Sequence, residues 1–143
     1  MRYLLDTNIV SDLIRNPQGK VAQHTRRVGE ALVCTSIIVA AELRYGATKK
    51  GSRRLSAQLE AVLAALEILP FETPADATYG VLRTRLEHAG TPIGANDLLI
   101  AAQAHALGYT VVTDNNKEFA PGSKIFGAKT GCGELDVSSG RAS

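Results

Sequence analysis

The sequence predicts an α/β domain of three layers, in which a mainly parallel central sheet is flanked by helices. Short apolar runs of the kind that form buried strands alternate along the chain with longer segments whose apolar residues recur at helical spacing. This alternation is typical of parallel sheets with helical connections. Two of the apolar runs, residues 3–5 and 111–113, each lead directly into an aspartate, Asp6 and Asp114.

The overall composition fits a single globular domain. The chain has 143 residues, of which 45% are hydrophobic and 21% are charged, and this argues against disorder. The net charge of +2 leaves nucleic acid open as a partner. No run approaches the roughly 18 apolar residues of a membrane span, and no signal peptide precedes the first expected strand, so we expect a cytoplasmic protein.

The two cysteines lie in unlike surroundings. Cys34 is inside an apolar run, where it is expected to behave as a small buried hydrophobic residue, whereas Cys132 follows a glycine near the end of the chain. One such pair does not make a disulfide framework, and two thiols are too few for a zinc site built from several thiolates.

The first half of the chain is expected to hold two strands and three helices. Thr7 and Asn8 are candidate N-caps for the first helix, and Gly46 is a candidate end for the third. The expected order is a strand over residues 2–6, helices over 9–15 and 21–28, a strand over 31–35, and a helix over 38–46.

The second half begins with a basic segment, residues 48–54, which we expect to be a linker. Two helical stripes, two strands and a very apolar helix then follow. That helix is apolar on nearly every side, so we expect it to be central and packed on both flanks, with His105 as a core histidine. The stripes are Leu55, Leu59, Val62, Leu63 and Leu66, then Tyr79, Leu82, Leu86 and Ala89; the strands are residues 67–71 and 109–114, and the apolar helix is 94–108.

We expect the domain to span residues 1–126. After residue 126 the chain becomes rich in Gly and Ser and carries little apolar pattern. Residues 127–143 are therefore expected to form a mobile C-terminal tail that contributes little to the core.

Four acidic residues stand out as candidate site residues. Asp6 and Asp114 each follow an expected strand, Asp97 opens the very apolar helix, and Glu42 interrupts an apolar helix. Ligands of open α/β sheets bind beyond the carboxyl ends of the strands, and acids are seldom buried without a partner. Carboxylates that converge in a small domain need a cation among them, and hard oxygen ligands favour Mg²⁺ or Mn²⁺.

Each acid also has a purely structural alternative. Asp6 could cap the helix that follows it, and Asp114 could belong to a turn with the asparagines after it. Asp97 could occupy the favourable first turn of its helix, and Glu42 could lie on a solvated helix face. The four acids taken together favour the metal site more strongly than any one of them alone.

Four segments of the sequence together form a known pattern. They are Leu-Asp-Thr-Asn at 5–8, Ala-Ala-Glu-Leu at 40–43 with Gly46, Gly-Ala-Asn-Asp at 94–97, and Val-Thr-Asp-Asn at 112–115 with Glu118-Phe119. In this order they resemble a PIN domain and, more narrowly, are similar to the VapC-type ribonuclease toxins of bacterial toxin–antitoxin pairs and to the FitB-like proteins. The resemblance runs from residue 2 to about residue 119.

The resemblance implies a Mg²⁺- or Mn²⁺-dependent endoribonuclease that is a homodimer and that a small antitoxin blocks. By position, Asp6, Glu42 and Asp97 match the acids of the family. Asp114 matches a place where this branch carries Asn or Asp, and Thr113 matches the small hydroxyl residue beside it. Members of the family end with a short apolar strand, part of which Ser123–Phe126 would form here. Residues 127–143 depart from the family pattern, which affects that strand and part of the dimer surface.

The implied mechanism is attack by a metal-activated water, which leaves a 5′-phosphate and a 3′-hydroxyl. Asp6 and Asp97 are the first candidates for direct ligands, while Glu42 would ligate through water or act as a base. Asp114 would complete the shell or support a second ion. A run of basic residues after Glu42 could hold RNA phosphates or could simply form a solvated loop. These are Arg44, Lys49, Lys50, Arg53 and Arg54.

Two alternatives from other functional classes compete with the nuclease. The first is a non-catalytic PIN-like domain that binds RNA or protein through the basic segment; the four acids argue against it. The second is a phosphoacceptor receiver domain, which would need a pair of adjacent acids after the first strand. Asp6 is followed instead by Thr7 and Asn8.

Overall fold

Four short parallel strands form the centre of the fold. The computed structural model describes residues 2–113. Its sheet has the order β3-β2-β1-β4, and each neighbouring pair is parallel. Leu4 in the middle of β1 is in register with Cys34 of β2 and Val111 of β4. The strands are β1 (Tyr3–Leu5), β2 (Val33–Ser36), β3 (Glu67–Leu69) and β4 (Thr110–Val112).

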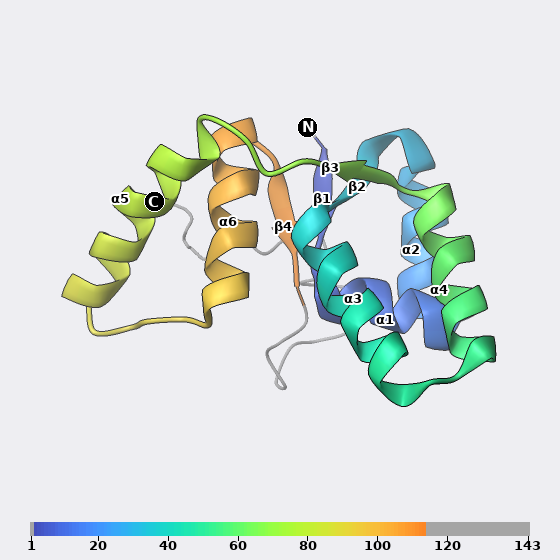
Figure 1. The fold of residues 1–143 in the computed structure, drawn as a ribbon. Helices are drawn as coiled ribbons and strands as arrows, with labels where there is room; N and C mark the ends of the chain where they lie inside the picture. Colours follow the sequence, from blue (N-terminus) through green and yellow to red (C-terminus); the bar gives the residue numbers. More distant parts are fainter. Residues whose placement is uncertain (1, 114–143) are drawn as a thin grey trace.

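Helices cover the sheet on both sides, as the sequence predicted. Figure 1 shows α5 and α6 to one side of the strands and α1 to α4 to the other. None of the helices within the described part of the chain is long and apolar enough to cross a membrane. Their bounds are α1 (Thr7–Arg15), α2 (Lys20–Val28), α3 (Ile37–Lys50), α4 (Arg53–Ala65), α5 (Ala75–His88) and α6 (Ala95–Leu107), with a short 3₁₀ helix, η1 (Glu30–Leu32), before β2.

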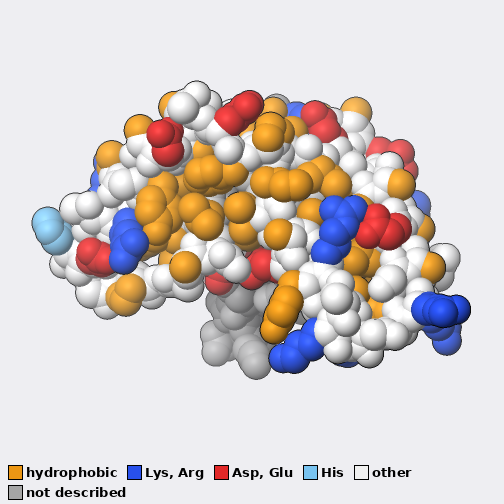
Figure 2. All heavy atoms as spheres, in the orientation of Figure 1, with side chains coloured by type: hydrophobic (Ala, Val, Ile, Leu, Met, Phe, Trp, Pro, Cys, Tyr) orange, Lys and Arg blue, Asp and Glu red, His pale blue; other side chains and the backbone are white. Residues whose placement is uncertain are grey.

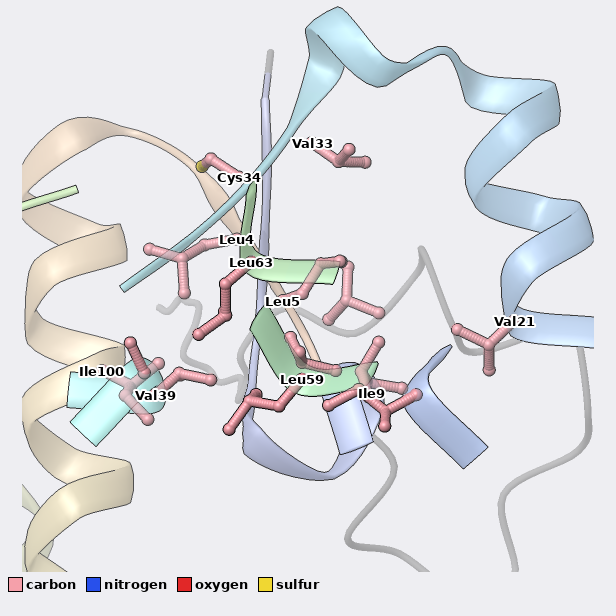
Figure 3. Packing of buried hydrophobic residues seen from close by; sticks show 14 of the residues in the cluster. Leu4, Leu5, Ile9, Val21, Val33, Cys34, Val39, Leu59, Leu63 and Ile100 are labelled. Atoms are coloured by element: carbon pink, nitrogen blue, oxygen red, sulfur yellow. The ribbon is translucent and has the colours of Figure 1, made fainter. Parts of the chain in front are cut away.

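The core lies where helices α1, α3, α4 and α6 meet the sheet. Leu4 and Leu5 of the central strand are fully buried, as burial on both faces of a parallel sheet requires. In Figure 3, Val39 of α3 and Ile100 of α6 point toward each other. The apolar stripe of α4 also packs here, with Leu59 and Leu63 buried. This stripe therefore serves the core of its own chain.

Cys34 is a buried free thiol in β2, as predicted, and its Sγ contacts the Tyr3 carbonyl oxygen at 3.5 Å. Burial raises the pKa of this thiol to about 11. Because the thiolate is the reactive form, we expect Cys34 to resist a maleimide at pH 8 in the folded protein and to react after denaturation. Mass spectrometry of the labelled peptide checks this, and equally fast labelling in both states would contradict it.

The structure corrects the expected bounds of one helix, one linker and one strand. Gly46 does not end α3, which continues to Lys50 and stops at Gly51, a residue in the left-handed conformation that favours glycine. The basic segment 48–54 is consequently not a linker: its first three residues end α3 and its last two begin α4. The short 3₁₀ helix likewise takes the first two residues of the strand expected over 31–35.

The polar residue buried in α6 is Gln103 rather than His105. His105 is exposed, so its expected place in the core is wrong. Gln103 is 1% exposed, and its Nε2 donates to the carbonyl oxygens of Leu69 and Pro70 at 3.2 and 2.9 Å. The amide thus fastens α6 to the end of β3. The expected strand around Ser123–Phe126 and the tail 127–143 lie outside the described residues.

Candidate active site

The carboxyl ends of β1, β2 and β4 define one edge of the sheet. The chain leaves β1 toward β2 on one side and returns as β4 on the other, so β1 and β4 flank the point where the strand order reverses. Such switch points are where open α/β sheets bind ligands. Asp6 follows β1 here, and its N–H donates to the Val112 carbonyl oxygen of β4 at 3.1 Å.

Asp6 is the N-cap of α1. Its Oδ1 accepts a hydrogen bond from the Ile9 N–H at 3.1 Å, and the residue is only 5% exposed. The structural alternative for this residue is therefore realised, and the cap is Asp6 rather than Thr7 or Asn8. A carboxylate offers about four acceptor positions on its two oxygens, so capping a helix and binding a cation are compatible roles for one residue.

Glu42 is held by donors from two other helices. It lies partly buried in the second turn of α3. The Thr7 hydroxyl at the start of α1 donates to its Oε1, and the Asn96 Nδ2 at the start of α6 donates to its Oε2 at 2.7 Å. One carboxylate thereby connects α1, α3 and α6. Glu42 therefore does not simply lie on a solvated helix face.

Asp97 lies beside Asn96 in the first turn of α6, where the helix dipole favours a negative charge. The residue is exposed at the surface, yet the pKa of its carboxyl is raised, first because neighbouring atoms shield it from water and second because of the charge of Glu42. A carboxyl whose ionisation a neighbouring carboxylate disfavours is an electrostatic feature of a cation site.

The structure brings three of the four predicted acids to this edge of the sheet, while Asp114 lies outside the described residues. Within residues 2–113, no three His, Cys, Asp or Glu side chains are grouped so as to hold a metal ion by themselves. Mg²⁺ commonly takes only one or two protein carboxylates and completes its shell with water and substrate oxygens. The donor set of hard oxygens around Glu42 and Asp97 fits that requirement.

Thr7 and Asn96 are contributors to the site that the sequence did not reveal as such. Both stand next to a predicted acid, in Asp6-Thr7 and Asn96-Asp97, and this adjacency was the available signal. Their contact with Glu42 depends on how α1, α3 and α6 pack, and no local pattern encodes that packing.

The basic residues after Glu42 divide into two groups. Arg44 forms a two-point pair with Glu60 of α4, with its Nε and Nη2 at 3.0 and 2.8 Å from the carboxylate oxygens. The others lie around the turn between α3 and α4, where Figure 2 shows Lys and Arg side chains at lower right. Arg44 is thus paired within the protein although its side chain is exposed, and the turn carries the other exposed basic residues of the segment.

Relatives of known identity match most of the chain. The sequence matches the PIN domain over residues 3–121. It is 41% identical over 121 residues to ribonuclease VapC2 of Rickettsia felis, covering 83% of this chain and 90% of the relative. It is 34% identical over 128 residues to the tRNA(fMet)-specific endonuclease VapC of Salmonella typhimurium, covering 87% and 96%.

Solved structures agree. VapBC2 of Rickettsia felis bound to a fragment of its promoter DNA has a chain with a TM-score of 0.76 and 39% identity, covering 83% of this chain and 91% of that one. A chain of FitAcB from Neisseria gonorrhoeae gives 0.68 and 31%, covering 78% and 86%. VapBC-5 of Mycobacterium tuberculosis, a member of a family of toxin–antitoxin systems, gives 0.60 and 29%, covering 80% and 86%. The protein belongs to the PIN-domain family and, within it, to the VapC ribonucleases.

Proposed function

We propose that this protein is the toxin of a toxin–antitoxin pair and cleaves RNA with the help of Mg²⁺ or Mn²⁺. The observation that carries the proposal is the Glu42–Asp97 pair at the switch point of the sheet, where shielding from water and, second, the charge of Glu42 raise the pKa of Asp97. A divalent cation there would relieve this repulsion. The toxin role is supported by the VapC relatives and by the VapBC complexes.

Asp6, Glu42, Asp97 and Asp114 are the proposed metal and catalytic residues. A bound ion would polarise a phosphoryl oxygen and make a water molecule more acidic. Glu42, which accepts hydrogen bonds from Thr7 and Asn96, is the proposed group that orients the attacking water and accepts its proton. The water oxygen bonds to phosphorus, the bond to the 3′ oxygen breaks, and that oxygen takes up a proton. The products are a 5′-phosphate and a 3′-hydroxyl.

The partners follow from the same relationship. Structures of VapBC complexes support an antitoxin partner, which we propose covers the site, and the proposed substrate is cellular RNA in the cytoplasm. The Salmonella relative is named for a transfer RNA, so transfer RNA is one candidate substrate. The domain is proposed to span residues 1–126, with 127–143 as a separate tail.

The direct test incubates the purified protein with total cellular RNA in Mg²⁺, in Mn²⁺ and in chelator, and maps the new ends. We expect cleavage only with metal, with a phosphate at each new 5′ end. RNA that stays intact in both metals but still binds the protein would instead favour the non-catalytic PIN-like domain. Cleavage that persists in chelator would contradict the metal requirement.

We also propose a homodimer, on the basis of helix α5. Only Ala75 of this helix is buried, while Val81 is 52% exposed, and Figure 2 shows hydrophobic side chains gathered over the α5 and α6 half of the molecule. The apolar stripe of α4 does not add to this face, because it packs on the core of its own chain. An apolar face of this kind is buried when two copies share it across a two-fold axis.

Light scattering at tens of micromolar should therefore give twice the 15.2 kDa mass of one chain. Val81→Arg should lower the mass to that of one chain, because it places a charge in the shared face. Gln58→Arg on the exposed surface of α4 is the matched control and should not change the mass. A parent protein with the mass of one chain would contradict the dimer.

A further inference from the structure

An exposed aromatic side chain lies on the same face of α3 as Glu42. Tyr45 follows Glu42 by three residues and is 66% exposed, more than any other large hydrophobic side chain in the described part of the protein. Lys49 follows one turn later, and its Nζ lies 5.8 Å from the centroid of the tyrosine ring. Residues three, four and seven apart share one face of a helix, so Glu42, Tyr45 and Lys49 form a line.

Gly46 adds no side chain beside Glu42, Tyr45 and Lys49. It lies in the interior of α3, one turn after Glu42, where glycine is a poor helix former. A Cβ built on Gly46 would meet no atom within 4 Å, so neither packing nor backbone conformation requires glycine here. Because glycine has no side chain, nothing projects from α3 at this position beside Tyr45, and another molecule can approach the helix closely.

The surface that follows the Tyr45 ring toward the turn into α4 is positively charged. Lys50, Arg53 and Arg54 follow Lys49 around the turn into α4, and all three are exposed. A cation at an aromatic face next to further positive side chains suits a polyanion that also carries flat rings. Single-stranded RNA has both properties, since its bases stack on aromatic side chains while its phosphates pair with basic ones.

We propose that Tyr45 is a stacking platform for an unpaired nucleobase of the RNA, with Lys49 contacting an adjacent phosphate. This inference rests on the proposed function and assigns the substrate as RNA that is single-stranded beside the cleaved bond. A base inside a duplex is already stacked on its neighbours and offers no free face. The platform would hold the nucleotide one helical turn from Glu42.

The chain contains no tryptophan, which permits a direct test. Tyr45→Trp places a single indole on the platform, and Leu107→Trp, at a residue 44% exposed at the far end of α6, is the matched control. In chelator, where no cleavage occurs, a short single-stranded oligoribonucleotide should quench the indole at residue 45 and not the one at residue 107. The same oligoribonucleotide annealed to its complement should quench neither.

Binding measured by anisotropy of a labelled oligoribonucleotide completes the test. Tyr45→Ala should weaken binding roughly 10- to 100-fold, while Tyr45→Phe, which keeps the ring, should bind like the parent. Gly46→Ala should also weaken binding. Gly80→Ala is its control, because Gly80 is another interior helical glycine with nothing within 4 Å of a built Cβ. Both glycine variants should melt at or above the parent temperature.

Two results would overturn the platform. The first is an unquenched indole at residue 45 when the labelled RNA is bound. The second is parental binding by Tyr45→Ala; if that variant is also monomeric in light scattering, Tyr45 is a subunit contact instead. A different result would show that the proposed function is wrong while the platform is correct. In that case RNA would bind and stack on residue 45 but would remain intact in the presence of metal.

Discussion

Asp97→Asn is expected to slow RNA cleavage by at least ~100-fold while leaving the fold intact, because activation of the water depends on the ion. The raised pKa of Asp97 means that its ionised form is disfavoured in the folded protein relative to the unfolded chain. At pH 7 the charge therefore costs stability when no cation is present. In chelator, the variant should melt at the same temperature as the parent or higher. Cleavage rates and thermal melts of the same preparations check both expectations.

Two further substitutions separate charge from local structure. Asp6→Asn should also lose activity but keep the cap on the Ile9 N–H, because asparagine caps helices as well as aspartate does. Asp76→Asn, in the exposed first turn of α5, removes an aspartate away from the site and should cleave like the parent. Asp97→Asn with parental activity, or with a melting point lowered in chelator, would show that this residue only supports the first turn of α6.

Leu4→Ala is expected to lower the free energy of unfolding by about 2–5 kcal/mol. Leu4 is 0% exposed in the central strand, where truncation removes apolar contacts and leaves a cavity. Because β1 leads directly into Asp6, the Leu4→Ala variant should also cleave RNA more slowly than the parent at temperatures near its melting point. Urea unfolding with an unchanged slope measures the effect. Leu107→Ala, at a residue 44% exposed, is the control and should cost less than about 1 kcal/mol. Equal losses would contradict the assigned core.

The order and type of the elements could be predicted because buried strands and amphipathic helices carry opposite periodicities. The residues at which these helices and strands begin and end were harder to predict. Gly46 is tolerated inside α3, since tertiary packing of Val39 and Ala40 outweighs the weak helix propensity of one glycine. In α6 the apolar pattern is nearly continuous, so it could not show that His105 faces solvent and Gln103 faces the core.

The candidate site was predictable to the extent that acids at strand ends and helix starts share one edge of a parallel sheet. Asp6 and Asp97 could be placed there from the sequence. The role of Thr7 and Asn96 in holding Glu42 could not, because those hydrogen bonds join residues 35 and 54 positions apart. The double role of Asp6, which both caps α1 and stands at the site, was visible only as two competing interpretations.

The central claim is that the acids at this edge bind a divalent cation. Calorimetric titration of Mn²⁺ into the RNA-free protein tests it most directly, with the parent, Asp97→Asn and Asp76→Asn compared in one buffer. The account predicts saturable binding by the parent and by Asp76→Asn, and at least ~10-fold weaker binding by Asp97→Asn, with melting points raised by the equivalent of roughly 1–3 kcal/mol only in the first two. Identical Mn²⁺ binding by all three proteins would contradict it.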